Sequence, residues 1–572
     1  MLEVVRIEMD DALVTAWRAN VAQARAHLGW DANAASMARF HARGMSLAIA
    51  APVDQLYAAT EVNEWALCAA LHDRDPMHWC GLRDALRSAA QQSDPTPATP
   101  YPAEIDVSAA LARLTSIATA EARPGLRELV DGARSRDLPV VLDDEMVTLG
   151  SGAHGRSFAL TDLPRAATVP WQAMAAVPTA LVTGSNGKTT TVRLVAACAR
   201  EQGWRPGYCC TDGVFVDGAA LATGDYSGPA GARQVLRDAR VEAAVLETAR
   251  GGILRRGLAL TRADVAVVTN VSADHFGEYG IHDLDALADV KLTVGAVVRP
   301  GGTLVLNADD ATLRAKAPGL EHRFGRSPPL AWFARDADSE WLVARRASGG
   351  MTCGVRAGCL VLSRDGAEHE LGAVVDMPLT VGGRAGYNVA NLAAAALAAT
   401  GLGVEPATIA AVCARFGARV ADNPGRMMRF ERNGMQVLVD YAHNPEGLAG
   451  LLEVAMALRG DGGRLGLVLG HAGNRADRDI ERLAATAAQF APALVVVKEL
   501  EGFLRGREPG DVPRILRAAL RRAGLPEHAL PMQPTEVDAV RYALAWGRPG
   551  DVLALPVHGL AARAAVLELL GT

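Results

Sequence analysis

The 572-residue chain has little lysine, few aromatic residues and no long apolar runs. Lys and Arg number 58 against 64 Asp and Glu, and the net charge of -6 argues against a general binder of nucleic acid or anionic membranes. No stretch approaches the roughly 18 uncharged apolar residues of a membrane-spanning helix. The first residues, Met1 to Asp11, carry carboxylates where a signal peptide needs a basic stretch and then an apolar one. We therefore expect a cytoplasmic protein that binds neither nucleic acid nor membranes.

The cysteines show no pairing pattern. They are scattered and include no CxxC motif, so we expect reduced, mostly buried thiols rather than disulfides or metal ligands. Cys353 and Cys359 have no histidine nearby that would complete a zinc tetrahedron. The eight cysteines are Cys68, Cys80, Cys198, Cys209, Cys210, Cys353, Cys359 and Cys413.

Lysine is the scarcest charged residue. Only Lys188, Lys291, Lys316 and Lys498 occur among the 58 basic residues, and all the others are arginine. The chain thus uses arginine wherever a positive charge alone suffices. Each lysine is a candidate for a task that a guanidinium group cannot perform.

The order of apolar segments predicts an α/β fold. With 50% hydrophobic and 21% charged residues, the composition is that of a globular protein, and at about 150 residues per domain the length predicts three to four domains. From about residue 175, short apolar runs alternate with longer helical patterns, which is typical of a mostly parallel sheet covered by helices. We expect strands at 179–183, 243–246, 265–269, 435–440, 464–469, 493–497 and 551–555.

The expected domain division follows these textures. Residues 1–170 are rich in Ala and Arg, have helical periodicity at 10–28 and 106–136, and contain a Pro-rich linker at 93–102. Residues 330–380 look strand-rich and irregular. We expect a mixed α/β N-terminal domain (1–170), a P-loop-type central domain with a mostly parallel sheet (171–420) and a Rossmann-like α/β C-terminal domain (421–572).

A glycine-rich segment, Thr183-Gly-Ser-Asn-Gly-Lys-Thr-Thr190, follows the first of these strands and opens a helix. Backbone N–H groups at such a helix N-terminus bind phosphate. Lys188 would reach the β- and γ-phosphates of ATP, and the Thr189 hydroxyl would bind Mg²⁺. Val182 stands where the strict P-loop pattern has glycine, and a chance glycine-rich turn is the alternative. The predicted phosphate-binding residues are Gly184, Ser185, Asn186, Gly187, Lys188, Thr189 and Thr190.

Two further strands end in residues that suit the same site. One ends at Glu247, whose carboxylate can hold a metal on the triphosphate, and another leads into Thr269-Asn-Val-Ser-Ala-Asp-His275. A helix that begins near Asp283 carries Lys291. Taken alone, His275 suits an ordinary loop histidine better than a ligand. Because the carboxyl ends of parallel strands meet at one edge of a sheet, we expect a shared metal and nucleotide site.

Seven motifs in one order connect these residues to a known family. They are TGSNGKTT (183–190), Glu247, TNVSADH (269–275) with Lys291, NADD (307–310), YNVANLAAAALA (387–398), PGRM (424–427) and DYAHNP (440–445). In this set and order the chain resembles the Mur ligase superfamily, which includes the muramyl-peptide amino-acid ligases and folylpolyglutamate synthetase. ETARGGILRRGL and DNPGRM followed by VLVDYAHNP resemble the ligase half of the cyanophycin synthetases, which make an aspartate-arginine polymer.

The resemblance implies an ADP-forming amide ligase. A substrate carboxylate attacks the γ-phosphate of ATP to give an acyl phosphate, and an amine then displaces the phosphate. Catalytic roles are implied for Lys188, Glu247, His275 and Lys291. Thr189 and Glu247 would hold one Mg²⁺ and Glu247 with His275 a second. In many family members the lysine that corresponds to Lys291 is carbamylated and becomes an anionic oxygen ligand.

The resemblance also implies roles outside the phosphate loop. Asn388 and Asn391 match residues near the adenine, and Arg426 and Asp440 match residues of the third domain that close on the nucleotide. DYAHNP by itself fits a strand and an Asn-Pro turn equally well. His443 and Asn444 of this motif are candidate substrate contacts.

Three arginines, Arg250, Arg255 and Arg256, follow Glu247 and can pair with carboxylates bidentately. The segment 470–479 resembles a loop of the third domain, although Asn474 stands where an Asp is usual. For 498–508 we favour a solvated mixed-charge loop over part of an amine pocket, and His558 has no assigned role.

The amino-terminal part departs from the cyanophycin synthetases, which have an ATP-grasp domain before the Mur-like half. Val53 to Trp65 and Leu142 to Gly152 faintly resemble their first domain, and the phosphate loop follows within about 35 residues, so we expect no ATP-grasp domain. The predicted substrates are an aspartyl or peptide carboxylate and a basic amino acid. The alternatives are a scaffold subunit for a separate ATP-grasp ligase and a folate-type or muramyl-type ligase. Self-association stays open.

Overall fold

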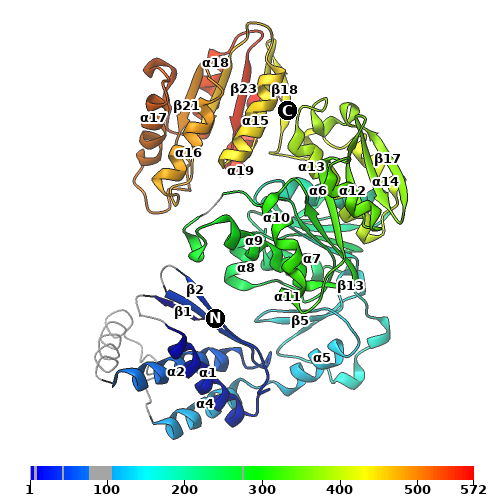
Figure 1. Ribbon diagram of the computed structural model, residues 1–572, viewed down its shortest axis with the longest axis vertical. Coiled ribbons are helices and arrows are strands. Elements are labelled where there is room, and N and C mark those ends of the chain that lie inside the picture. Colours follow the sequence, from blue (N-terminus) through cyan, green and yellow to red (C-terminus); the bar gives the residue numbers. More distant parts are fainter. Residues whose placement is uncertain (1, 6–9, 42–43, 77–105, 274–275, 572) are drawn as a thin grey trace.

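The computed structural model describes residues 2–5, 10–41, 44–76, 106–273 and 276–571, and the Pro-rich segment 93–102, Cys80 and His275 lie outside these ranges. Figure 1 shows three tiers, with the N-terminal elements at the bottom, a large central sheet in the middle and a C-terminal sheet with its helices at the top. The expected α/β fold class is confirmed.

An eleven-stranded sheet forms the middle tier of the described structure. The strands from β8 to β15 in the sheet order run parallel, and antiparallel hairpins extend both edges. In sheet order the strands are β10 (Ala219–Thr223), β9 (Gly213–Val216), β8 (Pro206–Cys210), β11 (Ala243–Glu247), β7 (Thr179–Thr183), β12 (Ala263–Val268), β13 (Val298–Asn307), β14 (Leu330–Asp336), β15 (Thr352–Arg356), β16 (Cys359–Arg364) and β17 (Ala367–Ala373).

Helices cover both faces of this sheet, which explains why its inner strands are apolar throughout. All five residues of β7 are buried, with Ala180 and Val182 facing one helical layer and Leu181 the other. In α13 the Ala-rich run Ala393 to Ala399 lets the helix pack closely on the sheet and on α6. One layer contains α6 (Lys188–Glu201), α13 (Gly386–Leu402) and α14 (Pro406–Cys413), and the other α7 (Pro229–Arg237), α8 (Arg250–Arg256), α9 (Leu284–Leu292), α10 (Ala311–Lys316), α11 (Leu320–Phe324) and α12 (Glu340–Ala347).

The C-terminal tier is a six-stranded sheet between two helical layers. Its strands are parallel except for β18 at one edge. In sheet order they are β18 (Met428–Arg432), β19 (Met435–Asp440), β23 (Val552–Pro556), β20 (Leu465–Leu469), β21 (Leu494–Lys498) and β22 (Met532–Gln533). Its helices are α15 (Pro445–Leu458), α16 (Asp477–Ala488), α17 (Asp511–Arg522), α18 (Glu536–Trp546) and α19 (Leu560–Leu570).

The N-terminal tier contains two small antiparallel sheets. The expected helical periodicity over 106–136 is confirmed and divides into two helices, because Pro124 cannot continue the first and stands at the first position of the second, where a missing N–H costs nothing. The elements are β1 (Leu2–Val5), α1 (Asp11–Leu28), β2 (Ser36–His41), β3 (Gly44–Ile49), α2 (Leu56–Arg74), α4 (Val107–Glu121), α5 (Pro124–Arg134), β4 (Val140–Leu142), β5 (Met146–Leu149) and β6 (Arg156–Ala159).

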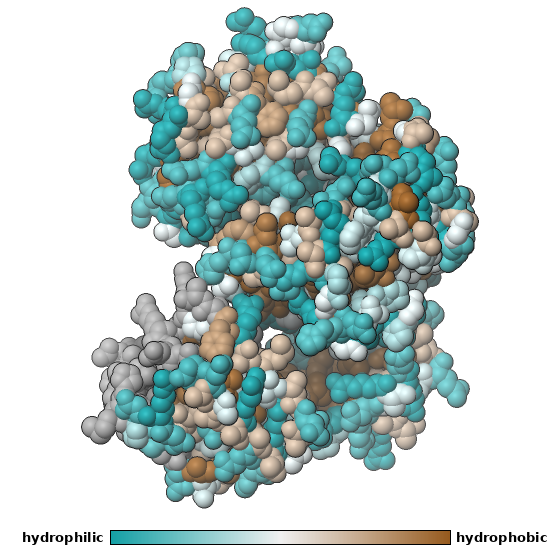
Figure 2. All heavy atoms as spheres, in the orientation of Figure 1, coloured by the Kyte–Doolittle hydropathy of each residue, from teal (hydrophilic) through white to brown (hydrophobic). Residues whose placement is uncertain are grey.

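Residues 330–380 do contain four strands, but α12 interrupts them. The seven described cysteines are free thiols. Over the described ranges no helix is both long and apolar enough to cross a bilayer, and the face shown in Figure 2 is covered largely by hydrophilic residues.

Candidate active site

A cavity of about 1730 Å³ lies between the central and C-terminal tiers. It opens at the carboxyl ends of the parallel strands β7, β11 and β12, where ligand sites form in open α/β sheets. The C-terminal tier contributes the ends of β19 and β23 and the start of α15. Both tiers therefore contribute polar side chains to the same cavity.

The phosphate loop joins β7 to α6 and depends on two glycines. Gly184 and Gly187 have φ angles of +150° and +82°. A Cβ on Gly184 would lie 1.8 Å from Thr269 Oγ1, and a Cβ on Gly187 would lie 2.1 Å from Asn391 Oδ1. Gly187 is also the N-cap of α6 and has no side chain to cap its N–H groups. Gly187 and the first residues of α6 line the cavity, and the N–H groups of a helix N-terminus are the kind of donor that binds phosphate.

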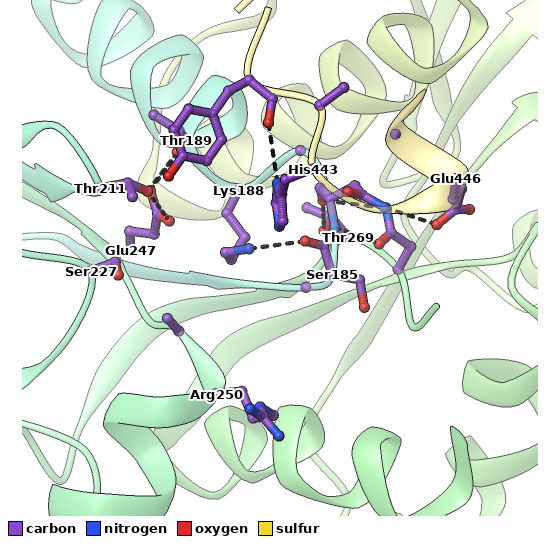
Figure 3. A pocket seen from close by; sticks show the side chains of 18 of the residues that line it. Ser185, Lys188, Thr189, Thr211, Ser227, Glu247, Arg250, Thr269, His443 and Glu446 are labelled. Atoms are coloured by element: carbon purple, nitrogen blue, oxygen red, sulfur yellow. Dashed lines mark hydrogen bonds between the residues drawn. The ribbon is translucent and has the colours of Figure 1, made fainter. Parts of the chain in front are cut away.

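The strand end after β12 holds this loop in place. Asn270 receives two backbone hydrogen bonds, from Ser185 N to its carbonyl oxygen (3.0 Å) and from Asn186 N to Oδ1 (2.9 Å). Ser185 Oγ donates to the Ser272 carbonyl oxygen at 3.0 Å. Lys188 Nζ lies over the loop and donates to the Ser185 carbonyl oxygen at 3.0 Å, as Figure 3 shows.

Glu247 and two hydroxyls form a set of oxygen donors beside the loop. Thr189 Oγ1 donates to Glu247 Oε2 (2.8 Å) and Thr211 Oγ1 donates to Glu247 Oε1 (3.0 Å), and the three side chains lie together in Figure 3. Hard oxygen ligands of this kind suit Mg²⁺, so the donor chemistry of this site fits the expected metal. The sequence analysis missed Thr211, although its place just after β8 is the same strand-end signal that pointed to Glu247.

The structure describes only some of the residues expected at the second metal site. Lys291 on α9 is 3% exposed and lines the cavity. Asp283 caps this helix by accepting from Ala286 N at 2.7 Å, as the sequence predicts for its start. His275 lies outside the described residues, and within the described ranges no three His, Cys, Asp or Glu side chains gather into a metal site. The roles of His275 and Lys291 therefore stay predictions.

The two asparagines of α13 lie behind the phosphate loop. Asn388 Nδ2 donates to the Leu379 carbonyl oxygen (2.9 Å), and Asn391 Nδ2 donates to Asn388 Oδ1 (3.1 Å). Both side chains are buried and border the cavity. These bonds tie the two amides to each other and to Leu379, with Asn391 Oδ1 close to Gly187, and an adenine contact stays a prediction.

The C-terminal tier contacts the phosphate loop directly through Asn186. Asn444 Nδ2 donates to Asn186 Oδ1, and Asn186 Nδ2 donates to Glu446 Oε2, both at 2.9 Å. Asn444 Oδ1 also accepts from Gly447 N at 2.8 Å and caps α15. DYAHNP is therefore both an Asn-Pro helix start and a contact to the loop. His443 lines the cavity with its Nδ1 3.2 Å from the Tyr441 carbonyl oxygen.

Arg426 and Asp440 lie next to each other on the C-terminal side of the cavity. The Arg426 guanidinium stacks 4.2 Å from the centroid of the Tyr441 ring. Asp440 Oδ2 accepts from Met427 N at 2.6 Å, and burial raises the pKa of Asp440 above its ordinary value.

A buried ionic cluster around Asp212 links the two tiers. Arg193 of α6 and Arg563 of α19 each donate to one Asp212 oxygen at 2.6 Å, and both also donate to the Pro424 carbonyl oxygen. Burial alone would raise the pKa of Asp212, but Arg426, Arg193 and Arg563 lower it below its ordinary value. No local sequence signal indicates this cluster, because Arg426 and Arg563 lie hundreds of residues away from Asp212.

Asp212→Asn is expected to destabilise the protein by about 3–5 kcal/mol, since it leaves buried guanidinium groups without their anion. The lowered pKa means that this stabilisation is present above the unfolded-state value near pH 3.9 and is lost as the pH falls further. Denaturant unfolding at pH 7 and at acid pH measures both effects. Asp217→Asn is the control, because Asp217 pairs with Arg200 at the exposed surface. Equal stability of the two variants at pH 7 would contradict the assignment.

The three predicted carboxylate-binding arginines do not act alike. Arg250 is buried and pairs with Glu278, whose Oε1 also accepts from Arg475 Nη1 and Asn474 Nδ2, each at 2.9 Å. Arg255 and Arg256 are exposed residues at the cavity margin. The same turn accepts a hydrogen bond from the N-terminal tier, from Arg39 Nη2 to the Tyr279 carbonyl oxygen at 2.8 Å. In this structure the carboxylate beside Arg250 is therefore the chain's own.

The solvated-loop interpretation of 498–508 is wrong for its first residue. Lys498 ends β21, is fully buried and forms an ion pair with Glu536. Glu501 and Glu508 are exposed as expected, whereas Leu500, Phe503 and Arg505 line the cavity. Lys316 in contrast makes surface ion pairs with Asp285 and Asp289.

The fold and the site define a class of α/β protein in which a phosphate loop on a parallel sheet faces a second α/β domain across one cavity. The family models named Mur ligase middle domain and Mur ligase, glutamate ligase domain match residues 182–399 and 425–555. A 2,6-diaminopimelate-adding muramyl ligase (UDP-N-acetylmuramoyl-L-alanyl-D-glutamate--2,6-diaminopimelate ligase) of Xanthomonas campestris is 32% identical over 74% of this chain and 79% of its own length. The chain belongs to the Mur ligase family.

The cyanophycin synthetase of Trichormus variabilis is 39% identical over 59% of this chain, and the chain spans 37% of the length of that relative. The predicted resemblance to the Mur ligases and the cyanophycin synthetases is thus confirmed. Among solved structures, the folylpolyglutamate synthase of Mycobacterium tuberculosis, complexed with ADP and AMPPCP, matches with a TM-score of 0.50 at 19% identity and covers 69% of this chain and 91% of its own. That match supports the fold.

Proposed function

We propose that this protein is an ATP-dependent, ADP-forming ligase that joins a substrate carboxylate to an amino-acid amine in the cytoplasm. The observation that carries the proposal is the grouping of Lys188, Thr189 and Glu247 at one rim of the cavity, with the C-terminal tier bonded to the same loop through Asn186. We retain 1–170, 171–420 and 421–572 as the proposed domains.

The proposed reaction has two displacements. A carboxylate oxygen attacks the γ-phosphorus, the bond to the β,γ-bridging oxygen breaks, and ADP leaves. The amine nitrogen then attacks the acyl carbon, phosphate leaves with the C–O bond electrons, and the amine loses a proton. Such a sequence depends on positioning and charge compensation more than on covalent help from the protein.

The residues of the chain supply that positioning. The N–H groups at the start of α6 and Lys188 would hold the phosphates, and Thr189 and Glu247 would hold Mg²⁺ with Thr211 fixing the carboxylate. When bound, the metal compensates negative charge on the phosphates. Arg426 and Asp440 line the C-terminal side of the cavity and would contact the nucleotide there.

The products distinguish this mechanism from adenylation. We expect one ADP and one phosphate for each amide bond, because in the proposed site the loop and Glu247 would hold the terminal phosphates. Chromatographic analysis of nucleotides after turnover with Mg²⁺ measures this. AMP and pyrophosphate as products would overturn the acyl-phosphate route.

The proposed substrates are an aspartyl or peptide carboxylate and a basic amino acid, arginine first, on the strength of the similarity to the cyanophycin synthetases. We expect the chain to add one residue to a preformed acceptor rather than to extend an aspartate backbone. Mass spectrometry after incubation with ATP, Mg²⁺, aspartate and arginine should show no polymer, whereas an aspartyl peptide acceptor should gain one residue. A growing polymer would contradict the proposal.

A second candidate is a muramyl-type ligase, which the longer alignment with the Xanthomonas campestris enzyme favours. Phosphate release screened over pairs of acids and amines, including diaminopimelate, separates the two. Release only in the presence of a separate ATP-grasp ligase would instead favour the scaffold alternative.

A further inference from the structure

The fully buried Lys498 begins a chain of polar contacts that ends at the cavity. Its side chain is 0% exposed, and Nζ contacts a Glu536 oxygen and the Pro556 carbonyl oxygen. Burying a charged lysine is costly unless it is paired and hydrogen-bonded. The contacts that this ion pair makes in this part of the molecule therefore have to offset the cost of burying it.

Glu536, the first residue of α18, gathers donors from the turn after β23. His558 N donates to Oε1 at 2.9 Å and Gly559 N donates to Oε2 at 2.7 Å. The Lys498 contact to Pro556 fixes the strand end just before this turn. Because α19 begins directly after Gly559, the carboxylate also sets the start of the helix that carries Arg563 to Asp212.

His558 passes this anchoring on to the loop that follows β19. Glu536 Oε1 holds its backbone N–H, and the neutral ring with its proton on Nε2 donates to the Ala442 carbonyl oxygen, 3.2 Å away. In that tautomer Nδ1, 3.3 Å from Glu536 Oε1, carries no proton. The His558 ring also packs edge-on against Tyr441, with centroids 5.1 Å apart. Arg426 lies over the same Tyr441 ring, 4.2 Å from its centroid.

We propose that Lys498, Glu536 and His558 form a positioning network that sets residues 440–443 for nucleotide binding. The inference rests on the proposed function, because it assumes that this loop closes on ATP. None of the three is placed at the reacting atoms. They act through Ala442 and Tyr441 on the neighbouring Asp440 and Arg426.

The network also explains why a lysine stands at 498. A Cβ on Gly470 would lie 2.8 Å from Lys498 Cγ, so the side chain runs through a tight passage. A guanidinium is larger and planar, and it would have to fit the same closed space. We therefore expect Lys498→Arg to disrupt the contacts of the network, although it keeps the positive charge.

The charges in the network predict a pH dependence of binding that a role in packing alone would not produce. The groups that face His558 are Glu536, Lys498 and His443, and burial with the Lys498 charge lowers the pKa of His558 to about 4. The imidazole is then neutral across pH 5.5–8. Removing the Lys498 charge while keeping Glu536 raises that pKa toward neutrality, so binding should gain a pH dependence.

The test is calorimetric titration of the full chain with Mg²⁺ and ATP at several pH values. Gln can keep the donor to Ala442 and Asn cannot, so we expect His558→Asn to weaken binding about five- to tenfold and His558→Gln to stay within about threefold of the parent. Lys498→Met should weaken binding by a similar factor, and the size of that factor should change between pH 5.5 and 8. Lys316→Met, the same substitution at a surface ion pair, should change nothing.

These measurements distinguish a failure of the proposed function from a failure of the network. No binding by the parent protein would overturn the proposed function and this inference with it. Binding by the parent, with folded His558→Asn and His558→Gln variants equal in affinity, would overturn the network alone. If Lys498→Met fails to fold, the two His558 variants still decide.

Discussion

Lys188→Ala is expected to lower ATP turnover by about 10²–10³-fold, the usual loss when one preorganised charge donor is removed from a reacting group. Lys188 opens α6 and lies over the phosphate loop, where its ammonium group is bonded to the Ser185 carbonyl oxygen. The loop N–H groups and their bonds to Asn270 do not depend on this side chain. The variant should therefore keep its fold while losing charge compensation at the terminal phosphates.

The measurement is steady-state phosphate release together with the affinity for Mg²⁺ and ATP. We expect a greater loss in kcat than in ATP affinity, because charge builds up on the phosphates in the transition state. Lys316→Ala is the matched control, since Lys316 is a lysine on the surface of the same domain. More than a tenth of the parent rate in Lys188→Ala would remove Lys188 from the proposed mechanism.

Lys291→Arg is expected to be nearly as damaging as Lys291→Ala. Lys291 is 3% exposed, lines the cavity and stands in a chain that otherwise prefers arginine. In the proposed carbamate, a neutral lysine amine attacks CO₂, forms an N–C bond and releases one proton, which leaves an anionic oxygen ligand. Guanidinium does not lose its proton in proteins and cannot follow this route.

Rates at depleted CO₂ and with added bicarbonate provide the readout. The parent should lose activity at depleted CO₂ and regain it with bicarbonate, whereas both variants should stay slow under either condition. Intact-protein mass spectrometry of trapped samples checks the added mass. An active Lys291→Arg would show that positive charge suffices and would end the carbamate proposal.

Local patterns were enough to predict seven strands, β7, β11 and β12 among them, and the glycine-rich turn after β7, but they did not single out β8 or β13. The expected strand 179–183 matches β7, and the expected helix start near Asp283 matches α9. A short apolar run and an N-cap residue can each be recognised from a few neighbouring positions. The same is true of Glu247 at the end of β11. The helical periodicity over 106–136 did not locate the break between α4 and α5, because it continues across Pro124.

Contacts between distant parts of the chain could not be predicted. Asp212 meets Arg563 across 351 residues, and Glu278 meets Arg475 across 197. Lys498 looked like part of a charged loop because its neighbours are charged, and only the packing of β21 against α18 shows that it is buried. Such pairs have no spacing rule, because the fold decides which strand ends meet.

The close approach of Gly187 to Asn391 also bears on how the protein is made. The phosphate loop is finished early in synthesis, but the amide that its N-cap glycine packs against is translated 204 residues later. Strands β11 and β12, which flank β7, also follow the loop in the chain. A nascent chain that has not yet reached α13 therefore lacks one wall of its phosphate site, and nucleotide binding becomes a late event of biogenesis.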